Sequence, residues 1–204
     1  LPDQFVMKAN NGWGSNEVVL IKDKNQCDVD RLKAIASTWL YPWKFYYYQN
    51  MCITDEKPEK PLIVMEELLE QDDKKYLNDY KLYCCNGKVK FSMVITDRGS
   101  KDQTRTFVDT EWKVMPIRRA GKFSSSAPVK PENYEKMVEL AEILAKDIPF
   151  VRIDFYNLDG RIYVGEMTFT PGLFLRFNPS GADRYLGKFL DINDLVEEVN
   201  AKNV

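Results

Sequence analysis

Residues 151–172, VRIDFYNLDGRIYVGEMTFTPG, constrain the fold more than any other segment, because they read as two strands joined by a tight turn. Side chains alternate between the two faces of a strand, so the register of this hairpin decides which residues share a face. A two-residue turn at 159–160 would set Asp154 opposite Gly165 and direct Glu166 to the other side of the sheet.

A three-residue loop at 158–160, with its last residue left-handed after a type I turn, gives a different register. Asp154 then lies opposite Glu166, and Arg152 lies opposite Thr168, while the other face of the hairpin is entirely apolar. Because this register separates polar from apolar side chains, we expect the three-residue loop.

Two carboxylates directly opposite each other repel unless a positive charge lies between them. Asp154 and Glu166, with the hydroxyl of Thr168, supply the oxygen ligands that suit Mg²⁺, which enzymes hold with one or two carboxylates together with substrate phosphates. Arg152 on the same face has a planar fork that fits a phosphate or an acyl phosphate. The competing interpretation is a solvent-exposed face on which Arg152 balances the acids, and this segment alone leaves both open.

The remaining segments alternate between strand and helix patterns, which predicts an α+β fold. The expected strands are residues 5–9, 17–22, a buried strand at 61–69, and the pair 79–85 and 88–96, joined by the hairpin dipeptide Asn86-Gly87. The expected helices are one capped by Asp28 or Asp30 and ending near Leu40, one at 131–146, and a terminal helix from Asp194. Residues 98–130 are polar and Ser-rich, so we expect mostly loops there.

The chain has 204 residues and contains no histidine, which excludes Ser-His-Asp and Cys-His nucleophiles and histidine general bases. Its formal charge of −2 argues against a nucleic-acid binder.

The four cysteines show no paired C-x-x-C spacing, which argues against a zinc site and favours a reduced, cytoplasmic protein. No apolar run approaches the roughly 20 residues of a transmembrane segment. Since the chain starts without methionine and enters a strand at once, we expect it to lack an N-terminal portion.

A glycine-containing loop, NNGWGSN at 10–16, lies between the first two expected strands. Its G-x-G is typical of an ordinary hairpin. The alternative is a flap, formed around Gly12 and Gly14, whose backbone N–H groups bind nucleotide phosphates, with Lys8 beside it as a neutralising cation.

Two further pairs of charged residues also have two interpretations. Glu66 and Glu67 end an apolar strand. They are either a solvated strand end or a hinge whose backbone groups bind adenine and whose carboxylate binds a ribose hydroxyl. Asp79 and Lys81 lie two apart on one strand face, either as a surface ion pair or as part of a site.

The order of these motifs resembles that of ATP-grasp enzymes. The run GEMTFTPG is similar to the E-x-N-T-x-P-G of carboxylate–amine ligases such as D-alanine–D-alanine ligase. The segments DYKLYCCNGKVK, KPENYEKMVELAEIL and PFVRIDFYNLDGRIYVGEMTFTPG resemble the TupA-like ATP-grasp family of surface-polysaccharide (teichuronic-acid type) biosynthesis, from residue 5 to about residue 187.

The resemblance implies an ATP-grasp fold with two α+β subdomains that clasp the nucleotide: a lid with the glycine flap at 1–69 and a C-terminal subdomain at 70–204. From the resemblance we also expect this chain to lack the N-terminal part that precedes the fold in the family. The implied ATP-binding residues are Lys8, Gly12, Gly14, Glu66, Glu67, Leu68, Asp79 at the ribose, and Lys81. Lys81 and Arg152 would contact phosphate or acyl-phosphate oxygens, and Asp154, Glu166 and Thr168 would hold Mg²⁺.

Two positions depart from the family pattern. Thr168 stands where many ATP-grasp enzymes have a metal-binding Asn, so the second metal position is in doubt, although Asn178 could compensate. Asn11 stands at the position of the family's flap histidine.

The resemblance implies an ATP- and Mg²⁺-dependent ligase that activates a carboxylate as an acyl phosphate for attack by an amine, acting on a small molecule or a glycan precursor. Three alternatives stay open: a kinase on the same fold, a glycosyltransferase that uses a nucleotide sugar, and a nucleotide-binding domain without catalysis.

Overall fold

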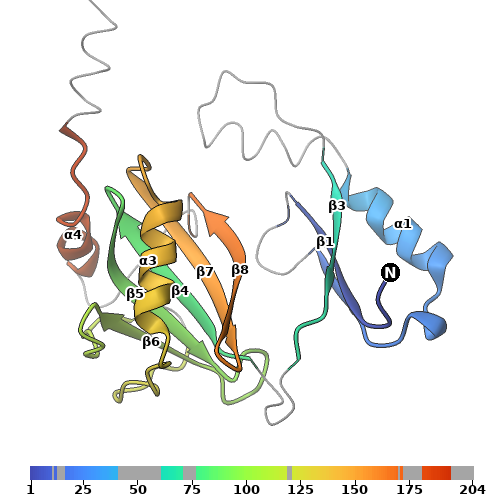
Figure 1. Cartoon of the computed structure of the whole chain (residues 1–204), viewed down its shortest axis with the longest axis horizontal. Coiled ribbons are helices and arrows are strands. Elements are labelled where there is room, and N and C mark those ends of the chain that lie inside the picture. The colour runs from blue at the N-terminus through green and yellow to red at the C-terminus, as the bar shows by residue number, and fades with distance from the viewer. Residues whose placement is uncertain are drawn as a thin grey trace, which may run out of the picture. The chain divides into compact units, whose positions relative to one another are not determined.

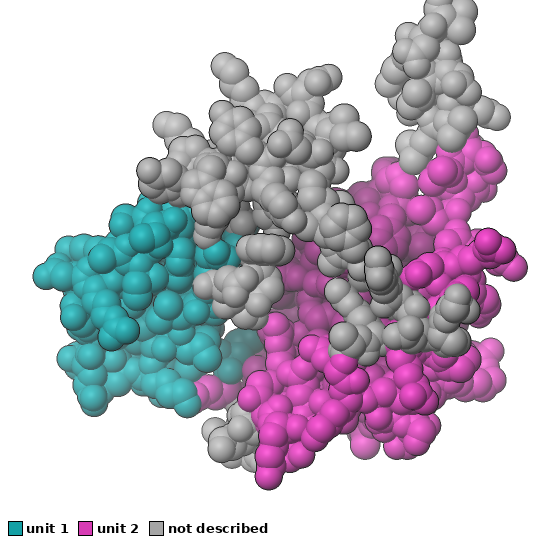
Figure 2. Space-filling view, turned by 180° about the vertical axis from the view of Figure 1, so that it is seen from behind, with its two compact units in different colours: residues 1–69 teal, residues 70–204 magenta. Residues whose placement is uncertain are grey.

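The computed structural model describes residues 1–10, 12, 17–40, 61–70, 77–118, 121–169, 171 and 181–193. The chain divides into two compact units, Leu1–Leu69 and Glu70–Val204, which are coloured separately in Figure 2. Both combine strands and helices, as the α+β prediction requires. Within the described residues, no helix is long and apolar enough to cross a membrane.

Unit 1 is a three-stranded antiparallel sheet with a helix on one face (Figure 1). The strands are β1 (Phe5–Ala9), β2 (Val18–Ile21) and β3 (Ile63–Glu67), in the order β2-β1-β3. A short 3-10 helix, η1 (Lys24–Gln26), leads into α1 (Val29–Trp39).

Asp28 caps α1, because its Oδ1 accepts a hydrogen bond from the backbone N–H of Arg31 at 2.9 Å. The apolar stripe of α1 packs on alternate residues of β1, and Phe5, Met7 and Trp39 are the large buried members of this core. The expectation of a buried third strand was wrong, because β3 is an edge strand whose last three residues are exposed.

Unit 2 is a five-stranded antiparallel sheet in the order β6-β5-β4-β7-β8. Its elements are β4 (Asp79–Cys85), β5 (Lys88–Thr96), β6 (Thr104–Asp109), α3 (Tyr134–Leu144), β7 (Phe150–Leu158), β8 (Arg161–Thr168) and α4 (Ala182–Gly187). The turn between β4 and β5 is Asn86-Gly87, with φ of 49° and 72°, as the dipeptide predicts. The terminal helix expected from Asp194 lies outside the described residues.

The two faces of this sheet differ in their side chains and in the helix that covers them. One face packs against α3, with Met137 and Ala141 over Leu82 and Ile153. The opposite face is apolar where α4 covers it, around Tyr83 and Phe91, and charged toward β7 and β8. The site residues of unit 2 lie on this second face.

The described residues of 98–130 are mostly loop and turn, as the sequence predicts, but they contain one strand that it did not reveal. They include β6, which pairs with β5 from Phe91–Asp109 to Thr96–Thr104. Its Phe107 and Val108 are fully buried on opposite faces of the sheet, so this strand contributes to both cores.

The β7–β8 hairpin contains both a confirmed and a wrong prediction. Asp154 does lie opposite Glu166, and Arg152 opposite Thr168. The loop, however, is the two-residue turn Asp159-Gly160, with φ of 49° and 78°. The two observations agree because the register shifts by one residue between Asp154 and Phe155, which makes Gly165 an unpaired bulge.

Glycine suits this bulge because there is little room for a side chain. A Cβ at Gly165 would lie 3.2 Å from Cε2 of Tyr156 and 3.4 Å from the carbonyl oxygen of Asp154. The bulge therefore places Glu166 beside Asp154 on one face and lets the Tyr156 ring lie against the strand.

Candidate functional site

Three neighbouring strands bring the predicted residues of unit 2 together. Lys81 on β4 is the register partner of Asp154 on β7, and Asp154 is the register partner of Glu166 on β8. Register partners on adjacent strands point to the same face, with Cβ atoms about 5 Å apart. The sheet therefore forms a row of a lysine and two acids from residues far apart in the sequence.

Arg152 lies between the two acids. Its Nε donates to Oδ1 of Asp154 at 2.6 Å, and its Nη2 donates to Oδ2 of Asp154 at 2.8 Å. The same Nη2 donates to Oε1 of Glu166 at 2.6 Å and to Oγ1 of Thr168 at 2.9 Å. The positive charge that two facing carboxylates require is thus supplied by the guanidinium of Arg152.

Lys81 continues this network onto β4, the central strand of the sheet. Its Nζ forms ion pairs with Oδ2 of Asp154 and, at 2.9 Å, with Oδ2 of Asp79. Lys81 and Asp79 are both buried, so the pair is not the surface ion pair that was the alternative interpretation.

Arg98 is a member of the site that sequence reasoning missed. Its Nη1 contacts Oδ2 of Asp79 and donates to Oη of Tyr156 at 3.3 Å. Arg98 follows the end of β5, and Asp97 before it has a left-handed φ of 51°. Nothing in the local sequence indicates that this turn directs Arg98 to Asp79.

We call Asp79, Lys81, Arg98, Arg152, Asp154 and Glu166 the charged cluster. Three carboxylates and three cations balance, so the cluster carries no formal net charge. Most of it is enclosed, since Asp79 has no exposed surface and Asp154 is 3% exposed. Interactions within it are therefore weakly screened by salt.

The two acids of the hairpin differ in their environments. Burial raises the pKa of Asp154, and the charges of Lys81 and Arg152 only partly offset that effect. Burial also acts to raise the pKa of Glu166, but the hydrogen bond from Thr168 and the charge of Arg152 outweigh it, so this pKa is lowered. The side chain of Glu166 is 58% exposed. Glu166 is thus the ionised acid that solutes can reach.

The oxygen atoms of Asp154, Glu166 and Thr168 are of the type that binds magnesium. Two carboxylates and a hydroxyl share one face, and they are hard donors of the type that Mg²⁺ prefers. Among the described residues, no three or more His, Cys, Asp or Glu side chains gather into a metal-binding group. Asp154, Glu166 and Thr168 would supply only part of a magnesium shell, and phosphate oxygens and water would complete it.

Three of the predicted ATP-binding residues of unit 1, Lys8, Glu66 and Glu67, lie on its sheet. Lys8 on β1 and Glu66 on β3 form an ion pair of 2.7 Å. Glu67 ends β3 and is exposed, and Leu68 follows it half-buried.

The described part of the glycine loop contains Gly12. A Cβ there would lie 3.1 Å from Cβ of Glu17 and 3.3 Å from the carbonyl oxygen of Ala9, so the chain is closely packed at this glycine. Gly14, Asn11 and Asn178 lie outside the described residues. The ATP-binding roles of the unit 1 residues stay predictions.

This chain is similar to several solved structures. D-alanine–D-alanine ligase from Bacillus anthracis matches over 98% of this chain and 54% of its own, with 16% identity and a TM-score of 0.50. The same enzyme complexed with ATP matches 84% of this chain and 41% of its own, with 15% identity and a TM-score of 0.45. The ATP-grasp ligase PsnB, complexed with a minimal precursor, matches 83% and 42%, with 11% identity and a TM-score of 0.43.

These solved proteins are longer, and the chain spans 41%, 42% and 54% of their lengths. Among curated proteins, none matches this chain. The two α+β units and the first of these likenesses define the class of fold, which is ATP-grasp. The family follows from the sequence match: the description "TupA-like ATPgrasp" covers residues 1–191, so the chain belongs to the TupA-like ATP-grasp family.

Proposed function

We propose that this chain acts in an ATP- and Mg²⁺-dependent ligation that activates a carboxylate as an acyl phosphate and joins it to an amine. The observation that carries the proposal is Arg152, held between Asp154 and Glu166 and next to Lys81 on one face of the sheet. The family and the ATP-grasp fold support the same reaction class.

In the proposed reaction, a substrate carboxylate oxygen attacks the γ-phosphorus of ATP, and the bond from that phosphorus to the β–γ bridging oxygen breaks, releasing ADP. The amine nitrogen then attacks the acyl carbon, and phosphate leaves with the electrons of the carbon–oxygen bond. The nitrogen's extra proton goes to phosphate or water. No histidine is required, because alignment and charge neutralisation lower the barrier.

The residues of the charged cluster have separate tasks in this reaction. Asp154 and Glu166 would hold Mg²⁺, which neutralises phosphate charge when bound. When released from the two acids, Arg152 would present its planar fork to the transferring phosphoryl group, and Lys81 would add a point charge beside it. The low exposure of Asp154, Lys81 and Arg152 excludes bulk water from these contacts, which strengthens them.

The other predicted residues are assigned on the resemblance. Lys8, with the loop at Gly12 and Gly14, would bind phosphates, and residues 66–68 would bind adenine. Asp79 was expected at the ribose. Its complete burial and its contacts with Lys81 and Arg98 favour instead a role in positioning Lys81.

We also propose that the acceptor is a precursor of a surface polysaccharide of the teichuronic-acid type and that the reaction takes place in the cytoplasm. Support for this comes from the resemblance of the segments at 79–90, 130–144 and 149–172 to proteins of that biosynthesis.

The test is ADP release by the full chain with Mg-ATP and a panel of carboxylates and amines. We expect the double variant Asp154→Asn plus Glu166→Gln to lose at least about 100-fold in turnover, since the ligands of a bound metal are removed. The control Glu139→Gln changes an exposed acid on α3 and should behave as wild type. Undiminished turnover in the double variant would refute the metal assignment.

One alternative is favoured by a specific observation. Asp154 is already engaged by Arg152 and Lys81, so a metal would have to displace these contacts, which favours a domain that binds nucleotide without turnover. Calorimetric binding of Mg-ATP with no ADP formed under any condition would favour this alternative. A stable phosphate ester among the products would indicate a kinase, and thermal stabilisation by nucleotide sugars alone would indicate a glycosyltransferase.

A further inference from the structure

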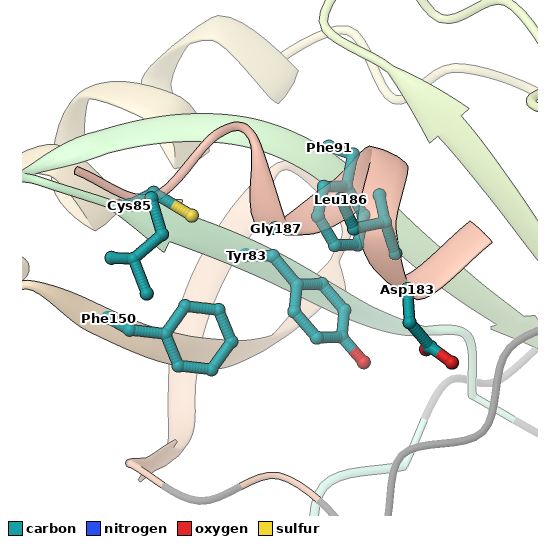
Figure 3. Close-up of a pocket in the computed structure, with 8 residues that line it drawn as sticks. Tyr83, Cys85, Phe91, Phe150, Asp183, Leu186 and Gly187 are labelled. Carbon is teal, nitrogen blue, oxygen red and sulfur yellow. The ribbon is translucent and has the colours of Figure 1, made fainter. Parts of the chain in front are cut away.

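A pocket of about 220 Å³ opens on the same face of the unit 2 sheet as the charged cluster. Tyr83 and Cys85 of β4 and Phe91 of β5 form one side, with Phe150 of β7 beside them (Figure 3). Leu186 of α4 forms the opposite wall. The pocket is thus a space between the sheet and the helix that covers it.

The side chains that line the pocket are mostly apolar or neutral, so they favour an uncharged group. The rings of Tyr83 and Phe91 are stacked, with centroids 4.4 Å apart and planes 15° apart, so this wall is held in place by its own packing. Burial raises the pKa of the Cys85 thiol, which keeps it neutral. Asp183 is the one charged residue among the described lining residues, and it is exposed. An uncharged ring or a branched alkyl group fits such a pocket.

The pocket adjoins the charged cluster through β4. Lys81, Tyr83 and Cys85 alternate along this strand and therefore face the same side. Tyr83 is also the register partner of Arg152 on the neighbouring strand, so the Cβ atoms of these two residues lie about 5 Å apart. A molecule with an apolar group in the pocket would need only a short arm to reach Arg152.

We propose that this pocket binds the apolar part of the carboxylate substrate, a ring or a branched chain joined by a short arm to the carboxylate that Arg152 and Lys81 receive. An engineered cavity of about 150 Å³ binds benzene, so a pocket of this size admits a six-membered ring with a substituent. The inference rests on the proposed ligase function and adds to it the substrate class, a carboxylate with a compact apolar group.

The probe for this proposal is 3-phenylpropanoate, with propanoate and 3-phenylpropan-1-ol as comparisons that lack the ring and the carboxylate. Binding to the full chain is measured by calorimetry, so it does not depend on turnover. We expect both comparisons to bind at least about tenfold more weakly, since each loses ring burial or the ion pair. Equal affinity of the alcohol or of propanoate would overturn the proposal.

Gly187 of α4, which lines the pocket, offers a variant that adds a side chain at the edge of the pocket. A Cβ at Gly187 would meet nothing within 4 Å, so Gly187→Leu adds a side chain where space is open. We expect this variant to bind 3-phenylpropanoate at least about tenfold more weakly while binding Mg-ATP as wild type does. The control Arg184→Ala changes an exposed residue of the same helix outside the pocket and should bind the probe normally. Unchanged affinity in Gly187→Leu would contradict the proposal.

A measurement on the wild-type chain covers the case in which Gly187→Leu does not fold. With labelled leucine methyl groups, nuclear Overhauser effects from the probe's ring protons to Leu186 and Leu190 are expected, and their absence at saturation would overturn the assignment. The two proposals fail in different ways. Ring-dependent binding without any ADP release leaves the pocket assigned and removes the ligase function. ADP release driven equally well by propanoate keeps the ligase function and removes the pocket proposal.

Discussion

Nη2 of Arg152 lies 2.6 Å from Oε1 of Glu166, on the face where Asp154 also receives the guanidinium. The arginine thus holds the position between two acids that we assign to a metal ion. A cation that binds there competes with Arg152, and a displaced Arg152 becomes available to a phosphate. Metal binding and phosphate binding are then coupled through one side chain.

The first prediction follows from this competition. Arg152→Met keeps the apolar stem of the side chain but removes the guanidinium and its charge, so the two carboxylates lose their cation. We expect Mn²⁺, used as a spectroscopic substitute for Mg²⁺, to bind the nucleotide-free chain at least about tenfold more tightly, since a unit charge near 4 Å is worth several kcal/mol at partly buried sites. Turnover with Mg-ATP should fall by at least about 100-fold, because the phosphate fork is lost.

Electron paramagnetic resonance titration measures the Mn²⁺ affinity, and the exposed substitution Arg184→Met is the control. An Mn²⁺ affinity in Arg152→Met no higher than that of wild type would show that the acids do not form the metal site.

The second prediction concerns Thr168, whose hydroxyl donates to Glu166 at 2.8 Å and accepts from Arg152 at 2.9 Å. A hydroxyl is a weaker metal ligand than an amide carbonyl. Thr168→Asn should therefore lower the Mg²⁺ concentration for half-maximal ADP release, and Thr168→Val should raise it, each by about three- to tenfold. The measurement is ADP release against Mg²⁺ at saturating ATP. Identical Mg²⁺ dependence in all three proteins would remove Thr168 from the metal site.

The pairing of Asp154 with Glu166 was predictable from the sequence, although the turn was not. Of the two registers considered, only this one places the acids, Arg152 and Thr168 on one face, and burial of the other face enforces it. The two-residue turn at 159–160 was rejected because it would disrupt this pairing in a regular ladder. A bulge at Gly165 makes both compatible, and a single glycine in a strand indicates a bulge without proving one.

Arg98 and β6 show where sequence reasoning stops. The strand TRTFVD has only two adjacent apolar residues, Phe107 and Val108, so no alternation reveals it among polar neighbours. Its pairing with β5 and the contact of Arg98 with Asp79 are tertiary contacts that local patterns do not encode. Sequence patterns thus located the hairpin acids, whereas Arg98, the third cation of the cluster, was identified only in the structure.

The third prediction tests the contact of Arg98 with Asp79. Oδ1 of Asp79 finds no hydrogen-bond partner among the described residues, so this buried carboxylate depends on Arg98 and Lys81. Because the Arg98 side chain is 38% exposed, water compensates part of its loss. We expect Arg98→Ala to lower the free energy of unfolding by about 1–3 kcal/mol.

The double variant Arg98→Ala plus Asp79→Asn should recover part of that loss, since the buried charge is gone. Urea unfolding measures both, with Arg184→Ala as an exposed control. A double variant that is less stable than Arg98→Ala by the full cost of Asp79→Asn would mean that the two residues act independently.

The fourth prediction concerns alkaline pH and Cys84, which lies buried under α3. Burial, with smaller contributions from Cys85 and Glu142, raises the pKa of Cys84 from 9.0 to about 12. The folded thiol therefore keeps its proton where the unfolded thiol loses it. Its contribution to stability is complete below pH 9.0 and is lost as the pH rises toward about 12.

Cys84→Ala tests this contribution, because removal of the thiol removes its titration. The variant should be less stable than wild type at neutral pH, since it leaves a cavity, but the difference should shrink above pH 9.0. Between the two pKa values, the difference in free energy of unfolding should shrink by up to about 1.4 kcal/mol per pH unit, the value for one proton. The control Val89→Ala truncates a neighbour in the same core that carries no proton, so its difference from wild type should not vary with pH. If Cys84→Ala and Val89→Ala showed the same pH dependence in urea unfolding, the buried thiol would not be the titrating group.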